Sequence, residues 1–404
     1  MSAHEDSAPK RHGRQQPFHR TQKAHSVSKN ALCDLEGSEA RMANLSQRAE
    51  HSFYNFVEPL DLGTGIMGDG LYAELAKTQA FQRLRQVRFL GGIDYILVPT
   101  PNGSKTRYTR FQHSLGVARL ALLYARRKEL NYEDRRTLYV AAMLHDIGHA
   151  PLSHSLEPMF LQKFGIEHHK ATSDIITGRA ELGLEVFKVL RWHGINVERV
   201  NALIAGEDRG FDGLFSGPIN FDTIEGILRS HSYATASPTV YSPEAITQAA
   251  IFRDVPKSKE IVDTFWYYKN LMYQTVINSE SGVLADFVCQ KFMEMNIRHF
   301  SKDDYFTTEE AIFRKMPGLR ELLTNKNFMH FARSYAKEPI YYKARSFFID
   351  QNVPFQTGPD GLRYQQSREQ KALLPHSTTQ VGTYGPSWDL FNENPLRAQQ
   401  TLFR

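Results

Sequence analysis

The 404-residue chain is long enough to bury a full hydrophobic core, and it combines 41% hydrophobic residues with a formal net charge of +5. No apolar run is long enough to span a bilayer and the N-terminus has no hydrophobic signal region, so we expect no membrane partner. The two cysteines, Cys33 and Cys289, are too few and too far apart for a disulfide framework, which favours a cytoplasmic protein.

The positive charge is concentrated at the N-terminus. Residues 1–50 are rich in Ser, His, Gln and Arg and show no sustained hydrophobic period, so we predict a disordered basic arm. The charged residues of its first part are Lys10, Arg11, Arg14, Arg20, Lys23 and Lys29, against Glu5 and Asp6. Such an arm could make weak contact with nucleic acid, although a solvated tail is the commoner explanation.

Most of the remaining chain has a helical pattern. Turn glycines after Phe56 predict a small hairpin or loop, and two prolines with an Asn-Gly turn interrupt residues 92–110. Gly148 and Pro151 end a helix. Apolar residues at helical spacing predict helices over about residues 71–91, 111–130, 133–147, 168–192, 196–205, 220–230 and 244–295.

These elements predict an all-α fold with minor β-hairpins and no internal repeat. The main helical domain is expected at residues 51–300, followed by a helical C-terminal extension at 301–350. After residue 350 the composition shifts to Pro, Gly, Gln, Ser and Thr, so residues 351–404 are expected to form a loop-rich tail.

Four histidines and an aspartate gather in two nearby stretches, HDIGHAPLSH from His145 to His154 and RFQHSLG around His113. A buried imidazole or carboxylate is costly unless something binds it, and one cation can bind several. The adjacent His145 and Asp146 offer one nitrogen and one oxygen ligand, which suits a divalent metal ion that acts on phosphate oxygens.

The predicted helices would bring His113 close to His145 and Asp146 if they pack antiparallel. Three ligands do not saturate a metal ion, and Asp222 in INFDTIEGILRS is the best candidate for a fourth. An aspartate at a helix start is equally well explained as an N-cap, so both interpretations stay open. A site of His and Asp ligands accepts Mn, Fe, Zn, Co or Mg, so the pattern predicts one divalent metal ion of unknown identity.

More titratable residues surround this centre. His149, His154, Glu157 and His168 follow within a short distance along the chain, and His154 and Glu157 share a helix face. A carboxylate beside a histidine raises the pKa of the imidazole and fixes its orientation, which prepares a general acid for a phosphoester leaving group.

The motifs RFQHSLG and LHDIGHAPLSHSLE together with the later Asp222 resemble the HD-domain phosphohydrolases. Within them the chain is most similar to the branch of dGTPase and the sterile-alpha-motif-and-HD dNTP triphosphohydrolase. The stretch AFQRLRQVRFLGGIDYILVP is similar to that branch's lead-in helix, and the resemblance covers about residues 56–295. It implies a nucleotide substrate and a homo-oligomer, and it identifies residues 51–300 as an HD phosphohydrolase domain.

The resemblance also implies roles for individual residues. The metal ligands would be His113, His145, Asp146 and Asp222. His168 would be the catalytic histidine and Glu157 its acidic partner. Arg110, His149 and His154 match residues that approach the substrate phosphates, and Lys269 stands where an arginine would grip the terminal phosphate.

The pattern departs from the branch around the substrate. After the metal-binding aspartate, the resembled branch continues with Lys, an Asp-Tyr pair and another Asp. At these positions this chain has Thr223, Glu225, Gly226 and Ser230. A Tyr-x-His pair is replaced by Ile277 and Ser279, and Lys269 keeps the charge of an arginine without its bidentate fork. The metal centre is therefore expected to be intact and the substrate pocket altered.

The leading prediction is a metal-dependent nucleotide phosphohydrolase that cleaves a dNTP to deoxynucleoside and triphosphate. One alternative is a phosphodiesterase acting on cyclic nucleotides or oligonucleotides, with the basic arm as a docking element. A second alternative is a nucleotide-binding sensor with little turnover.

Overall fold

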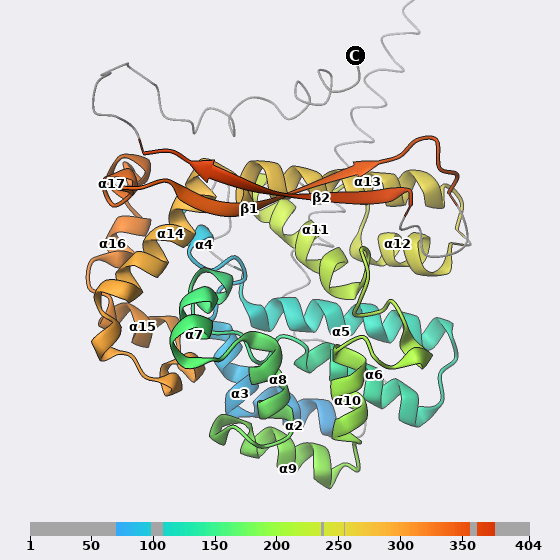
Figure 1. The fold of residues 1–404 in the computed structure, drawn as a ribbon. Coiled ribbons are helices and arrows are strands. Elements are labelled where there is room, and N and C mark those ends of the chain that lie inside the picture. Colours follow the sequence, from blue (N-terminus) through green and yellow to red (C-terminus); the bar gives the residue numbers. More distant parts are fainter. Residues whose placement is uncertain (1–69, 98–107, 236–237, 254, 356–361, 376–404) are drawn as a thin grey trace, which may run out of the picture. The chain divides into compact units, whose positions relative to one another are not determined.

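The computed structural model describes residues 70–97, 108–235, 238–253, 255–355 and 362–375. These residues form helices and a single two-stranded sheet (Figure 1), which confirms the predicted all-α class with a minor hairpin. Within the described ranges no helix combines the length and the hydropathy needed to cross a membrane. The predicted N-terminal arm and the turn region after Phe56 lie outside the described residues.

Most helices in the first half of the described chain have fewer than ten residues. Thr78 breaks the predicted helix over 71–91, because its side chain accepts a hydrogen bond from the backbone N–H of Phe81 and starts a new helix. The helices are α2 (Leu71–Lys77), α3 (Gln79–Arg83), α4 (Ile93–Ile96), α5 (Arg110–Arg127), α6 (Tyr132–Leu144), α7 (Glu157–Phe164), α8 (His168–Ile176), α9 (Leu184–Trp192) and α10 (Val197–Ile204).

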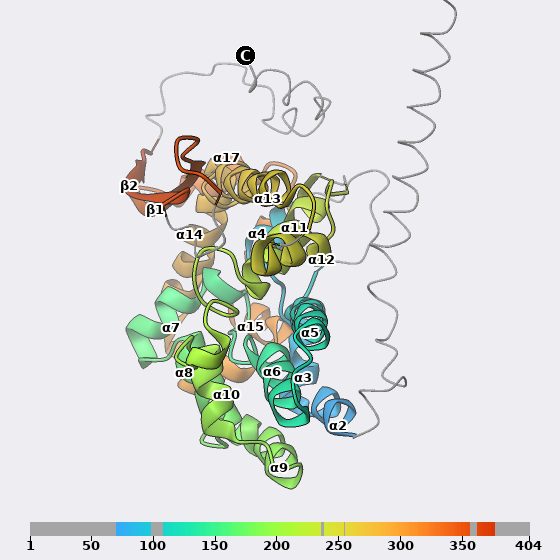
Figure 2. The same ribbon diagram turned by 90° about the vertical axis from the view of Figure 1, so that its right-hand side faces the viewer.

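Helices α5 and α6 carry the motif residues and lie side by side in both views (Figure 1 and Figure 2). Thr109 and Gln112 start α5 with a reciprocal capping box, and Asn131 caps α6. Because the connection between them is short, the start of α5 meets the end of α6. This packing brings His113 in α5 beside His145, which directly follows α6.

The second half contains longer helices. The predicted helix over 244–295 is divided, since Arg253 and Lys257 adopt left-handed backbone conformations and Ser279 caps a new helix. The helices are α11 (Phe221–Thr235), α12 (Pro243–Thr247), α13 (Ser258–Met272), α14 (Glu280–Met295), α15 (Glu309–Lys315), α16 (Leu319–Leu323) and α17 (Phe328–Ser334).

A β-hairpin follows, with β1 (Ile340–Ile349) antiparallel to β2 (Tyr364–Leu373). It lies along α13, where Trp266 donates a 3.0 Å hydrogen bond to the carbonyl of Phe348 and packs edge-on against Phe347. The helical extension predicted for residues 301–350 is therefore wrong for β1, which is a strand. The loop-rich tail predicted for residues 351–404 is wrong for β2, which is also a strand. Polar β2 becomes a strand through its hydrogen bonds to β1, which composition alone does not indicate.

A close backbone approach places α8 against the turn that follows α6. A Cβ built on Gly148 would lie 2.2 Å from the backbone nitrogen of Thr172 and 2.5 Å from the carbonyl oxygen of His168. Only a residue without a side chain permits this approach. Gly148 therefore allows its neighbour His149 to lie beside His168.

We expect Gly148→Ala to lower the free energy of unfolding by about 1–3 kcal/mol, because the added methyl group would overlap the backbone of α8. Urea denaturation measures this loss. Gly210→Ala is the matched control, since Gly210 is exposed and the nearest atom to its added Cβ is a flexible Asp208 oxygen at 3.1 Å. Equal stability of the two variants would contradict the close approach.

Candidate active site

Four of the predicted site residues converge from three helical segments. His113 lies in α5, His145 and Asp146 follow α6, and Asp222 lies in the first turn of α11. The Nε2 atom of His113 is 3.2 Å from Nε2 of His145, 3.0 Å from Oδ1 of Asp222 and 3.4 Å from Oδ2 of Asp146. The structure thus brings together all four residues predicted to bind the metal ion.

The hydrogen bonds of the two imidazoles test whether this cluster fits a cation. Nδ1 of His113 lies 2.5 Å from a Glu225 carboxylate oxygen, and Nδ1 of His145 donates to the carbonyl of Ala142 at 2.9 Å. Each Nδ1 therefore carries a proton, and in neutral rings the two Nε2 lone pairs face each other. A metal ion with bonds of about 2.1 Å holds neighbouring ligand atoms roughly 3 Å apart, so the observed spacing suits one divalent ion.

Three carboxylates, those of Asp146, Asp222 and Glu225, surround the ring of His113. Burial lowers the pKa of His113, but Glu225 and the two aspartates outweigh it and raise this pKa to about 9. Burial raises the pKa of Asp146, yet Arg110 and the neighbouring histidines hold it well below its usual range. The carboxylates that favour a proton on His113 also favour a metal cation in its place.

The structure decides between the two interpretations of Asp222. Asn220 caps α11, since its side-chain oxygen accepts the backbone N–H of Thr223 at 2.8 Å and Thr223 Oγ1 accepts the N–H of Asn220 at 3.0 Å. The carboxylate of Asp222 is not needed as a cap and contacts His113 instead. Because its side chain is 45% exposed, Asp222 lies on the open side of the cluster.

Arg110 is buried against this cluster. Its guanidinium donates to Oδ2 of Asp146 at 2.6 Å, to Oγ of Ser153 at 3.2 Å and to the carbonyl of Phe89 at 2.9 Å. These contacts orient Asp146 and place a permanent positive charge beside it.

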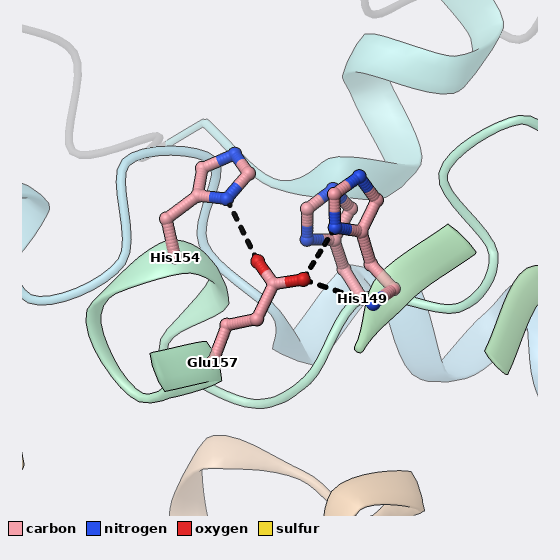
Figure 3. Close-up of side chains that lie close together, drawn as sticks. His149, His154 and Glu157 are labelled. Atoms are coloured by element: carbon pink, nitrogen blue, oxygen red, sulfur yellow. Dashed lines mark hydrogen bonds and ion pairs between the residues drawn. The ribbon is translucent and has the colours of Figure 1, made fainter. Parts of the chain in front are cut away.

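A second cluster surrounds Glu157 (Figure 3). Its Oε1 accepts hydrogen bonds from Nδ1 and the backbone nitrogen of His168 at 2.5 and 2.9 Å, and its Oε2 lies 3.1 Å from Nδ1 of His154. The ring of His149 stacks on that of His168, with centroids 4.5 Å apart. Nε2 of His149 also lies 3.1 Å from Oδ1 of Asp146, so this residue connects the two clusters.

Protonation differs among these histidines. Burial lowers the pKa of His168, but the hydrogen bond and charge of Glu157 outweigh it and raise this pKa above its ordinary value. Burial and the charge of Arg110 hold the pKa of His149 well below its usual range. His168 is therefore prepared to donate a proton, while His149 is a neutral neighbour that donates from Nε2 to Asp146.

Lys269, expected at the terminal phosphate, lies on α13. Its Nζ donates to the carbonyl of Pro218 at 2.7 Å and lies over the rings of Trp266 and Phe347. Burial lowers the pKa of Lys269 to about 8, and the charge of Asp222 opposes this shift. Its direct partners are thus in the segment before α11, in α13 itself and in the hairpin.

Glu225 has a role that the sequence analysis missed. It holds His113 in place and is itself ion-paired with Arg229 in the same helix. The available signal was its position three residues after Asp222, which puts both carboxylates on one face of a helix. Gly226 lets the ring of Phe89 pack close to α11 beside His113, since a Cβ there would lie 2.8 Å from that ring.

Comparison with known proteins agrees with this geometry. Residues 110–209 match the family described as HD domain. The chain is 27% identical over 315 residues to the uncharacterized protein MG461 of Mycoplasma genitalium, covering 72% of this chain and 70% of that protein. It is 31% identical over 183 residues to the uncharacterized protein YwfO of Bacillus subtilis, covering 44% of this chain and 40% of YwfO.

A relative with a named activity is the human deoxynucleoside triphosphate triphosphohydrolase SAMHD1. The identity is 39% over 229 residues, which is 54% of this chain and 29% of the human enzyme. The chain spans 70% of the length of MG461, but only 40% of the length of YwfO and 29% of that of SAMHD1.

We call His113, His145, Asp146 and Asp222 the metal-type cluster. The matched segment contains the first three of these residues, and it contains His168 and Glu157 of the second cluster. Its helical fold and its His-Asp cluster both agree with the family match. The match over residues 110–209 confirms the resemblance to the HD-domain family that the motifs predict.

Proposed function

We propose that the protein is a metal-dependent nucleotide phosphohydrolase that cleaves a dNTP to deoxynucleoside and triphosphate. The observation that supports this most is the adjacency of a cluster suited to a metal ion and a His168–Glu157 pair suited to proton donation. They are joined by the 3.1 Å contact between His149 and Asp146. The choice of nucleotide and bond follows the deoxynucleoside triphosphate triphosphohydrolase activity of the relative SAMHD1.

His113, His145, Asp146 and Asp222 would hold the metal ion. Such an ion supplies positive charge to phosphate oxygens and lowers the pKa of a water molecule. Arg110 keeps Asp146 in place for this role through its 2.6 Å hydrogen bond.

Water attacks the α-phosphorus, the bond from phosphorus to the 5′ oxygen of the deoxynucleoside breaks, and the proton that the water loses restores His168 for the next turnover. Glu157 accepts the Nδ1–H of His168 and fixes the ring, so that the Nε2–H is available to protonate the departing oxygen. His149 stacks on His168 and limits the rotation of its ring. His154 binds the other oxygen of Glu157 and is proposed, with His149, to approach the substrate phosphates.

The residues expected around the substrate differ from those of the resembled branch. Thr223, Gly226 and Ser230 replace larger or charged groups of the resembled branch, so the sugar and phosphate contacts differ. A homo-oligomeric state, a cytoplasmic location and weak nucleic-acid contact through residues 1–50 remain predictions.

The proposal is tested by incubating the purified protein with Mn²⁺ or Mg²⁺ and each dNTP and NTP, singly and mixed, and separating the products by chromatography. We expect deoxynucleoside and intact triphosphate. Mono- or diphosphate products would place the cleaved bond elsewhere. Absence of turnover with mononucleotides, combined with cleavage of cyclic nucleotides or oligonucleotides, would favour a phosphodiesterase.

The metal-ligand assignment predicts that the double variant His145→Ala, Asp146→Ala loses both its bound metal and its turnover, because two ligands are removed. Metal analysis by mass spectrometry and circular dichroism measure metal content and folding. A matched control replaces the exposed His299 and Asp303 by Ala and should keep the metal. A folded double variant that retained stoichiometric metal would disprove the assignment.

The proton-donor assignment predicts that His168→Ala keeps its metal but loses about 10²–10⁴-fold in kcat. In the wild type, kcat should fall as pH rises through the raised pKa of His168, because the protonated ring is the active form. Glu157→Gln removes the carboxylate that raises this pKa, so the decline should begin at lower pH. Glu181→Gln on the exposed surface is the control, and an unmoved pH profile in Glu157→Gln would contradict the pairing.

A further inference from the structure

The turn that carries His149 and His154 contains two residues in an unfavourable backbone conformation. Leu152 and Ser153 have φ angles of 59° and 44°, in the left-handed region that residues with a side chain seldom adopt. Two consecutive residues of this kind persist only where surrounding contacts impose the conformation. Three of the contacts that hold this turn come from outside the segment that matches the HD-domain family.

Glu309, the first residue of α15, holds the N-terminal side of this turn. Its side chain is buried, and Oε1 accepts the backbone N–H of Leu152 at 3.3 Å and that of Arg88 at 2.7 Å. Its Oε2 accepts the hydroxyl of Tyr95 at 2.6 Å. One carboxylate therefore connects α15, the segment before α4 and the residue that begins the left-handed turn.

Ser153 extends this connection to the metal-type cluster. Its hydroxyl donates to the carbonyl of Arg88 at 2.7 Å and accepts from Nε of Arg110 at 3.2 Å. Arg110 in turn binds Asp146. The turn and the metal-type cluster are therefore joined by one series of hydrogen bonds.

Asp286 in α14 holds the other side of His154. Its Oδ1 accepts the hydroxyl of Ser155 at 2.5 Å, and the same hydroxyl oxygen accepts the backbone N–H of Gly92 at 2.9 Å. Ser155 is buried, whereas the side chain of His154 between the two anchors is 61% exposed. The orientation of an exposed ring depends strongly on the backbone that carries it.

We propose that Glu309 and Asp286 are positioning residues that hold the backbone on both sides of His154 and so keep its imidazole against Glu157. The C-terminal helices α14 and α15 thereby complete a site whose motifs lie in residues 110–209. The effect on turnover rests on the proposed function, but the effect on the turn itself does not.

The test is Glu309→Ala, measured by hydrogen exchange of the peptide spanning residues 148–157 and by kcat. We expect faster exchange in this peptide, unchanged metal content and a loss of about 10- to 100-fold in kcat. Glu309→Gln should recover most of kcat, because an amide oxygen can still accept the N–H of Leu152. Glu310→Ala is the matched control, since that neighbouring glutamate is exposed and pairs with Arg320.

Asp286→Ala provides an independent variant if Glu309→Ala does not fold, because it removes a single hydrogen bond to Ser155. It should also speed exchange in the same peptide, and Asp286→Asn should restore protection. Unchanged exchange in the folded alanine variants would overturn the proposal. A wild type without turnover on any nucleotide would instead reject the proposed function, while the exchange measurement would still decide whether the two carboxylates hold the turn.

Discussion

Two imidazole rings from different helices face each other through nitrogen atoms 3.2 Å apart, and both rings use their other nitrogen to donate a hydrogen bond. His113 is fixed by Glu225 and His145 by the carbonyl of Ala142, so both rings keep their Nε2 atoms directed into the cluster. A divalent cation would bind both Nε2 atoms at once. The packing of α5, α6 and α11 matters to function because each helix contributes one part of this constraint.

Asp146 connects that cluster to the neighbouring residues of the site. It lies beside both facing imidazoles, accepts a hydrogen bond from Arg110 and contacts His149, whose ring stacks on His168. The permanent charge of Arg110 lowers the pKa of Asp146 and disfavours a proton on His149. Glu157 meanwhile favours a proton on His168. The site thus favours a proton on His168 and disfavours one on Asp146 and His149, as an acid beside a metal centre requires.

The site extends beyond the segment that matches the HD-domain family. Asp222 and Glu225 lie in α11, and the carboxylates that bind the turn around His154 lie in α14 and α15. Helix α14 contacts α7 and the short helical turn at Ser153–Ser155 directly. The helices after residue 209 therefore belong to the construction of the site, and the family motifs depend on them for their conformation.

The sequence by itself determined the helical class and the metal-type residues around His145, because these depend on local periodicity and on adjacent residue types. Glu157 as the acidic partner of His168 was implied only by the resemblance to the HD-domain phosphohydrolases. Only the tertiary structure decided that Asp222 faces His113 while Asn220 caps the helix. It also revealed Glu225 behind that histidine and the strand formed by residues 364–373. These features depend on which distant segments meet in space. The free energy of such contacts comes from partners far apart along the chain, and no local pattern records them.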